Sequence, residues 1–252
     1  MIKGFKLFHQ EKINSDKKYF CDNFIDFYEI GHKKNNYYFT YLLGCCYNFG
    51  MGVDEDLELA FYYYNLASKN NVVKAMRGLG SLYLDKNDLE NGLFWLSKAY
   101  ENNDLYSGYR LGLLYYRGRL IDRDYKKAYE YFFATKAVKA SAYMLGECYY
   151  YGNGVETDYA KAIEYFKYSE YSKAYYMIGS IYHKNLNNIN EAMEYYSLAV
   201  EYDDDRARLE LGIILFENND YEASIKYLEP MALNGNSKAL GYLYKMNYFN
   251  VK

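Results

Sequence analysis

A pair of residues, Leu-Gly or Ile-Gly, returns six times along this chain, at spacings of 36, 32, 34, 33 and 33 residues. In five of the six copies a tyrosine follows the glycine by three positions. Residues five and one before the glycine, the glycine itself and the residue three after it share one face of an α-helix. The pattern therefore predicts one amphipathic helix per copy, here called helix A. The glycines are Gly44, Gly80, Gly112, Gly146, Gly179 and Gly212.

A second pattern keeps step with the first and predicts a second helix, helix B. Each copy has a small residue, an Asp or Asn four positions before it, and a large apolar or aromatic residue four positions after it. The Asp or Asn is a natural N-cap, and the other two residues share a face. We expect Gly44 and Ala60 to be small because the two antiparallel helices touch there. The small residues are Ala60, Gly92, Ala128, Ala162, Ala192 and Ala223; the caps are Asp56, Asp88, Asp124, Asp158, Asn188 and Asn219; the large residues are Tyr64, Leu96, Phe132, Phe166, Tyr196 and Tyr227.

The linker between the two helices contains a glycine-rich stretch in copies 1, 3 and 4: GMGV at 50–53, GRLI at 118–121 and GNGV at 152–155. The first glycine of each is predicted to end helix A in a left-handed conformation, and the second to turn the chain. A phosphate-binding loop should follow a strand and precede a Lys-Ser/Thr or a βαβ unit, and the sequence has neither. The stretch is therefore interpreted as a structural joint.

Copy 4 carries a motif that resembles the Sel1-like repeat, a relative of the tetratricopeptide repeat with a longer loop. Copy 1 is nearly as good a match, whereas copies 2, 5 and 6 have shorter loops and read closer to plain tetratricopeptide units. The resemblance covers about residues 37–235 and implies an all-α fold, an α/α solenoid with a right-handed superhelix that binds proteins or peptides and has no catalytic residues and no cofactor. The matching residues of copy 4 are Leu145, Gly146, Tyr149, Gly152, Gly154, Val155, Asp158, Lys161, Ala162 and Tyr165.

The two ends of the repeat array are less regular. Residues 1–36 are predicted to form an N-terminal cap, in which Asp16, Phe20, Phe24 and Phe27 repeat the helix B pattern in degenerate form. Residues 236–252 are predicted to form a C-terminal capping helix. Solenoids need such ends because an open stack exposes its last apolar face. An end repeat left uncapped could pair with its copy in a homodimer.

Partner binding is predicted on helix A, which lines the inner wall in tetratricopeptide arrays. The positions six and three before, and one and four after, the Leu-Gly glycine should face that groove and are not needed for packing inside a repeat. Many are aromatic, and Tyr and Arg are enriched in binding hot spots. The alternative is that an A+T-rich coding sequence scatters the 37 tyrosines everywhere. The candidate partner-binding residues are Tyr41, Arg77, Tyr109, Tyr116, Tyr143, Tyr150, Tyr176 and His183.

Charge and reactive residues argue against other functions. The formal net charge is −3, so the chain lacks the basic character of a nucleic-acid binder. No stretch approaches the ~18 apolar residues that cross a membrane. The cysteines Cys21, Cys45, Cys46 and Cys148 have no paired spacing, which favours reduced thiols and a cytoplasmic location. The three histidines fall in no metal-binding pattern, so neither a metal site nor a catalytic site is expected.

Two functions remain from this reasoning. The leading interpretation is a non-enzymatic scaffold or adaptor that binds a protein or peptide in a tyrosine-rich groove. The alternative is a cognate inhibitor, such as an immunity protein that neutralises one toxin or enzyme.

Overall fold

The computed structural model describes residues 25–26 and 28–246, and this part of the chain is helical and contains no strand. The degenerate helix B expected at Asp16, Phe20, Phe24 and Phe27 lies outside the described residues, as does the end of the C-terminal cap beyond residue 246. The all-α repeat architecture predicted from the two patterns is confirmed, with the helix pairs of an α solenoid.

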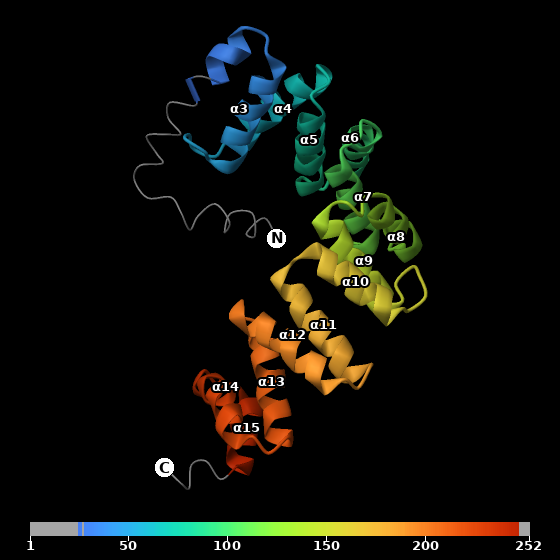
Figure 1. Ribbon diagram of the computed structural model, residues 1–252. Coiled ribbons are helices and arrows are strands. Elements are labelled where there is room, and N and C mark those ends of the chain that lie inside the picture. Colours follow the sequence, from blue (N-terminus) through green and yellow to red (C-terminus); the bar gives the residue numbers. More distant parts are fainter. Residues whose placement is uncertain (1–24, 27, 247–252) are drawn as a thin grey trace. The chain divides into compact units, whose positions relative to one another are not determined.

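The chain divides into two compact units, residues 1–123 and 124–252. Figure 1 labels the helices and colours them in sequence order. Within each unit a helix packs mainly on its neighbours in sequence. The helices of unit 1 are α3 (Tyr37–Phe49), α4 (Leu57–Lys69), α5 (Val73–Asp85), α6 (Leu89–Glu101) and α7 (Leu105–Arg117). Those of unit 2 are α8 (Tyr125–Ala134), α9 (Lys139–Tyr151), α10 (Tyr159–Ser169), α11 (Ser172–Lys184), α12 (Ile189–Glu201), α13 (Asp205–Glu217), α14 (Tyr221–Leu233) and α15 (Ser237–Lys245).

The predicted N-caps begin the B helices in the first four copies. Asp56, Asp88, Asp124 and Asp158 each accept a hydrogen bond from a backbone N–H in the first turn. These bonds satisfy donors that no helical carbonyl can reach. Asn188 caps α12 by position, but its side chain makes no such bond.

The sixth copy corrects the sequence pattern by one residue. Asp220, not Asn219, caps α14, and its carboxylate accepts from the N–H of Ala223. Ser224 and Leu228 are then the fully buried residues, in place of the expected Ala223 and Tyr227. Asn219 instead has φ +63°, a left-handed conformation that asparagine tolerates better than most residues. The same role falls to Asn87 and Asn103, each directly before an aspartate cap.

The glycine-rich linkers form the predicted joints. Gly50, Gly118 and Gly152 end α3, α7 and α9 in the left-handed conformation. The second glycine has a further role in copy 4, where φ of Gly154 is +79° and a Cβ there would lie 2.1 Å from the carbonyl oxygen of Tyr125. The α9–α10 linker therefore packs on the start of α8 and leaves no room for a side chain.

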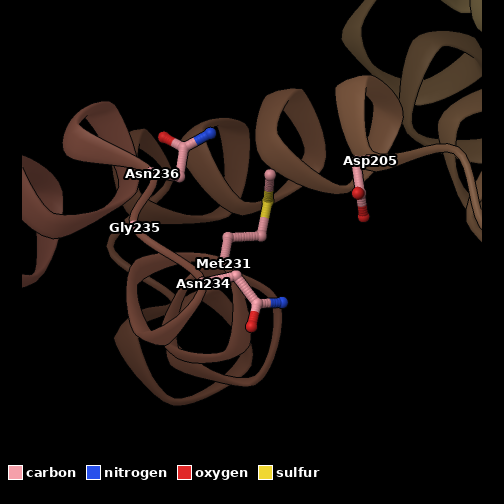
Figure 2. A pocket seen from close by; sticks show the side chains of 5 residues that line it. All are labelled: Asp205, Met231, Asn234, Gly235 and Asn236. Atoms are coloured by element: carbon pink, nitrogen blue, oxygen red, sulfur yellow. The ribbon is translucent and has the colours of Figure 1, made fainter.

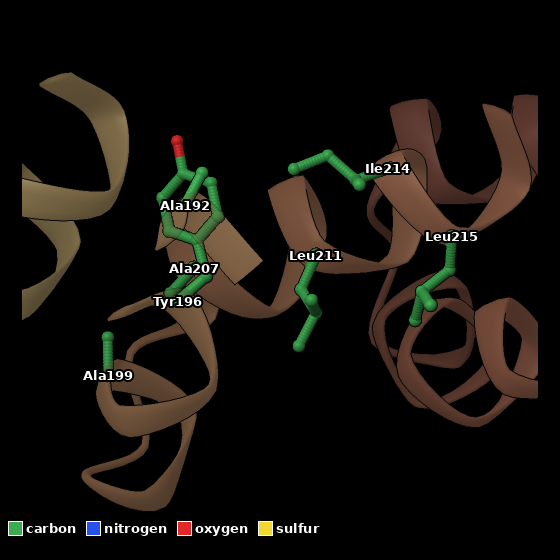
Figure 3. Close-up of a cluster of buried hydrophobic side chains, with 7 residues drawn as sticks. All are labelled: Ala192, Tyr196, Ala199, Ala207, Leu211, Ile214 and Leu215. Carbon is green, nitrogen blue, oxygen red and sulfur yellow. The ribbon is translucent and has the colours of Figure 1, made fainter. Parts of the chain in front are cut away.

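The Leu-Gly glycine is small because helix B packs directly on it. The predicted small residue of helix B is buried in the first five copies, and in copy 2 the two backbones meet, since a Cβ on Gly80 would lie 3.1 Å from the carbonyl oxygen of Gly92. In copy 1 a Cβ on Gly44 would instead meet the ring of Tyr64, 2.6 Å away. Tyr196 likewise covers Gly179. The glycine thus makes room for the large residue that helix B sends across helix A. Next to this contact, Tyr196 packs with Ala207 and Leu211 of α13 in an apolar cluster (Figure 3).

Candidate protein-binding surface

The large residue of helix B reaches across helix A, so a tyrosine in that position delivers its hydroxyl to the face where partner binding is predicted. In unit 1 the Tyr64 hydroxyl of α4 donates to Sγ of Cys45 on α3, at 3.4 Å. Cys45 is the residue after Gly44, on the predicted groove face. Burial, followed by the neighbouring Cys45, raises the pKa of Tyr64, so the phenol stays neutral and can donate.

Tyr41 of α3 is half-buried and lies against the same tyrosine. Its ring stacks on Tyr64 with centroids 6.0 Å apart, and Tyr38 tilts against it at 5.7 Å. Burial is the main cause that raises the pKa of Tyr41, and the nearby Cys45 adds to it. Tyr41 therefore packs partly against Tyr64 and Tyr38, and the rest of its side chain is exposed.

Arg77 of α5 is tied to the next helix. Its guanidinium donates to Asp104 Oδ1 at 2.7 Å and lies 5.3 Å from the ring centroid of Tyr106. Asp104 also caps α7, so one carboxylate joins α5 to the start of α7. Tyr109 and Tyr116 are half-buried on α7. In unit 1, Arg77 could therefore contact a partner with its side-chain surface, but its charge is already paired with Asp104.

Tyr143 of α9 departs from the expectation that this position is free of packing. Its side chain is 6% exposed because Phe166 and Tyr171 surround the ring, at centroid distances of 5.3 and 6.0 Å. The ammonium of Lys173 sits 3.6 Å from the ring centroid. A partner would meet Lys173 of α11 before it met Tyr143. Tyr150, seven residues further on α9, is half-buried against Tyr151 and Tyr159.

Tyr176 of α11 is in contact with two neighbours. The ring centroids of Tyr176 and Tyr196 are 5.9 Å apart, and the guanidinium of Arg206 lies 4.2 Å from the Tyr176 ring centroid. Arg206 is itself oriented by Asp204, the N-cap of α13, through bonds of 3.1 Å from Nε and 2.5 Å from Nη2. This hydrogen bond raises the pKa of Arg206. Tyr176 remains half-exposed, so its position is fixed before any partner arrives.

His183, one turn beyond Gly179, lies edge-on to Tyr196 with ring centroids 6.2 Å apart. Nearby, Glu210 of α13 pairs with Lys184 at 3.3 Å. Charges of both signs thus border this face. We call it the unit 2 A-face, and define it by Tyr143, Tyr150, Lys173, Tyr176, His183 and Arg206.

The sequence reasoning placed Lys173 and Arg206 on helix A but did not include them among the candidates. It also missed the hydroxyls of Tyr64 and Tyr196, because the large residue of helix B was treated only as packing. The signal that could have found them is tyrosine at that position in copies 1 and 5, where copies 3 and 4 have phenylalanine.

The described part of the chain contains no candidate metal centre. No group of three or more His, Cys, Asp or Glu is placed to hold a metal ion there. Cys46 and Cys148 are buried packing residues, as predicted, and burial raises the pKa of Cys148 to about 12, the opposite of an activated thiol. Within the same residues, no helix combines the length and apolar character that crossing a bilayer requires.

A small depression is lined by residues outside the set that defines the unit 2 A-face. It has a volume of about 260 Å³ and lies between the start of α13 and the α14–α15 turn (Figure 2). This is less than the ~300–1,000 Å³ of pockets that bury drug-sized ligands. Its lining residues are Asp205, Met231, Asn234, Gly235 and Asn236.

Solved structures of repeat proteins resemble this chain. A Sel1 repeat protein from Oxalobacter formigenes is 24% identical, with 80% of this chain and 89% of that chain covered and a TM-score of 0.65. A protective antigen of uropathogenic Escherichia coli with an SLR fold is 20% identical, with 89% and 59% covered and a TM-score of 0.58. These likenesses show the fold. No curated protein sequence matches the chain.

Family models identify the repeats directly. The Sel1 repeat model matches residues 39–72, 73–104, 107–133, 139–169 and 209–236, and a tetratricopeptide repeat model matches residues 172–206. Repeats of these kinds generally form scaffolds for protein interactions and are typically non-enzymatic. Since the Sel1 matches span more than half of its length, the chain belongs to the Sel1 repeat family.

Proposed function

We propose that this chain is a non-enzymatic interaction module that holds a segment of another protein against its A helices, with its main anchors on the unit 2 A-face. The observation that carries the proposal is the setting of Tyr176. Its ring contacts both Tyr196 and Arg206, yet it is only partly buried. Tyrosine and arginine are the side chains that most often dominate binding energy.

Fixing these groups in advance favours binding. An immobilised side chain costs about 0.5–1.5 kcal/mol of conformational entropy at an interface, and a side chain already held in place avoids that cost. Arg206 is oriented by Asp204 and Lys173 lies over Tyr143, so the cations on this face are oriented as well as the rings. The side chains of this face should therefore be preorganised for binding and should not need to become ordered when a partner binds.

Unit 1 would contribute a second set of contacts through Tyr41, Arg77, Tyr109 and Tyr116. Because Arg77 is already paired with Asp104, it offers contact area rather than a new ion pair. We therefore expect these four positions to form a separate set of contacts on unit 1 and to add less affinity per residue than Tyr176.

Affinity capture tests the proposal. The full chain is immobilised, exposed to a lysate of its source cells, and the captured proteins are quantified by mass spectrometry. Tyr176→Ala should lower capture about tenfold or more, as expected when a hot-spot anchor is lost. Tyr168→Ala is the matched control, since Tyr168 is 54% exposed on α10, a B helix. Equal capture by both variants and the unmodified chain would contradict the proposal.

The number of captured partners separates a scaffold from the inhibitor considered above. Several partners that dissociate readily support a scaffold. One stoichiometric partner that stays bound through extended washing would support an inhibitor instead, with the same face as its contact surface.

A further inference from the structure

Below the unit 2 A-face lie two polar atoms that the fold leaves without a hydrogen bond. Three buried side-chain polar atoms lack a partner within the described residues: Ser68 Oγ, His183 Nδ1 and the Tyr196 hydroxyl. The last two belong to rings in edge-on contact. A buried polar group without a partner costs about 1–3 kcal/mol, so two adjoining ones point to a group that is supplied from outside the fold.

The Tyr196 hydroxyl reaches this position because of Gly179. The ring is fully buried and passes over Gly179, where a Cβ would lie 2.6 Å from Cδ1. The hydroxyl is at the end of the ring that points away from Ala199 (Figure 3). It therefore lies on the α11 side of the ring, and two side chains of α11, Tyr176 and His183, contact Tyr196.

Unit 1 shows that the fold can satisfy such a hydroxyl by itself. There Tyr64, in the equivalent position, donates to Cys45. The residue equivalent to Cys45 in copy 5 is Ser180, which lies near the Tyr196 hydroxyl and slightly favours its ionised form, but forms no hydrogen bond of ordinary geometry with it. The unsatisfied hydroxyl is thus specific to copy 5.

The two atoms offer one donor and one acceptor. Burial, and then the charge of Glu210, raise the pKa of Tyr196, so its hydroxyl is neutral and can donate. His183 with its proton on Nε2 accepts at Nδ1. A carboxylate in this position would be repelled by Glu210, and an ammonium by Arg206 and Lys184. An uncharged group with both an acceptor and a donor is the best match.

We propose that this position receives an amide group of the bound protein segment, whose oxygen accepts from the Tyr196 hydroxyl and whose N–H donates to His183 Nδ1. The inference rests on the function proposed above. Access requires a rotation of the His183 side chain, which is half-buried, while Tyr176 keeps its place beside Arg206. The amide is either that of an Asn or Gln side chain or a backbone peptide group of an extended segment.

Selection from a random peptide library tests this. A phage-displayed library of ten-residue peptides is selected on the full chain, and the best peptides are synthesised and their affinities measured. Tyr196→Phe removes only the hydroxyl and should weaken binding about tenfold, the value of one well-placed hydrogen bond. The matched control Tyr64→Phe removes a hydroxyl that Cys45 already satisfies, and should change affinity less than about twofold.

The peptides themselves identify the source of the amide. If the selected peptides share an Asn or Gln, that residue is replaced by Asp or Leu. The amide belongs to this side chain if the replaced peptide binds the unmodified chain and Tyr196→Phe with equal affinity. If the peptides share no such residue, each peptide bond is N-methylated in turn. The amide belongs to the backbone if methylation of one bond removes the affinity difference between the unmodified chain and Tyr196→Phe.

Two failures remain distinguishable. Peptides that lose binding with Tyr176→Ala but bind Tyr196→Phe as tightly as the unmodified chain would overturn the amide position, with water as the remaining occupant, and leave the proposed function standing. Selection that yields no Tyr176-dependent peptide would count against both.

Discussion

The ring of Phe166 lies so close to the α-carbon of Gly146 that a methyl group there would come within 2.6 Å of two ring carbons. The two residues belong to the helices of one pair, α9 and α10. Neither ring carbon is the mobile end of a long side chain, because Phe166 is fully buried. The glycine of the repeat motif is therefore a packing requirement and not a source of flexibility.

Gly146→Ala should lower the free energy of unfolding by about 2 kcal/mol, the usual cost of overpacking a tight core. This loss opposes the gain in helix propensity that alanine brings. Gly241→Ala measures that gain alone, since nothing lies within 4 Å of a Cβ at this glycine of α15, and it should raise stability by roughly 0.5–1 kcal/mol. Urea unfolding followed by circular dichroism gives both values. An increase in stability for both variants would refute the packing argument.

Gly154→Ala should destabilise the protein more than Gly235→Ala. Both glycines have positive φ, +79° and +87°, so both variants carry the conformational cost of about 1–2 kcal/mol. At Gly235 nothing else lies within 4 Å, whereas at Gly154 the new methyl would meet the Tyr125 carbonyl at 2.1 Å. We expect a total of roughly 3 kcal/mol for Gly154→Ala. Equal midpoints in urea would show that the linker does not pack on α8.

Asp204 should make stability depend on pH in the acid range. Burial opposes its ionised form, but hydrogen bonds from Arg206 and from the N–H of Ala207 outweigh burial and lower its pKa. A lowered folded pKa stabilises the fold above the unfolded value of about 3.9, and this contribution is lost as pH falls through the folded value. Asp204→Asn keeps a side-chain cap but should lose about 1 kcal/mol at pH 7, because a neutral acceptor is weaker.

Urea unfolding at pH 7 and at pH 2.5 measures this effect. The gap between the unmodified chain and Asp204→Asn should be present at pH 7 and shrink at pH 2.5. Asp203→Asn, at a side chain that is 96% exposed, controls for the loss of one negative charge from the same turn. A gap of the same size at both pH values would rule out Asp204 as the source.

Local chemistry explains why much of the fold could be predicted. Asp56 and Asp158 were predicted correctly because aspartate is a strong N-cap signal at the start of a helix. Gly50 and Gly152 were predicted correctly because glycine adopts the left-handed conformation at a helix end without strain. The error at Asn219 arose because two good caps are adjacent. The pairs at 87–88 and 103–104 show the rule: the asparagine takes the positive φ and the aspartate caps.

The candidate surface was less predictable, because it depends on how side chains from neighbouring helices meet. Nothing in the sequence around Tyr143 indicates that Lys173 and Tyr171 of the next A helix cover it. Similarly, the hydroxyls of Tyr196 and Tyr64 have different neighbours because the residue after the glycine is Ser180 in copy 5 and Cys45 in copy 1. The sequence does not reveal the effect of this serine–cysteine exchange, because it depends on the tyrosine ring of helix B crossing helix A.

The contact between glycine and large side chain also bears on how such arrays change in length. In each case the two partners lie in adjacent helices of one pair, so a duplication or deletion with endpoints between pairs transfers both together. Endpoints inside a pair would combine helix A of one copy with helix B of another. A glycine that packs on a leucine could then face a tyrosine. Gain and loss of repeats is therefore expected to proceed by whole helix pairs. The contacts in this chain join Gly44 with Tyr64, Gly80 with Leu96, Gly146 with Phe166, Gly179 with Tyr196 and Gly212 with Leu228.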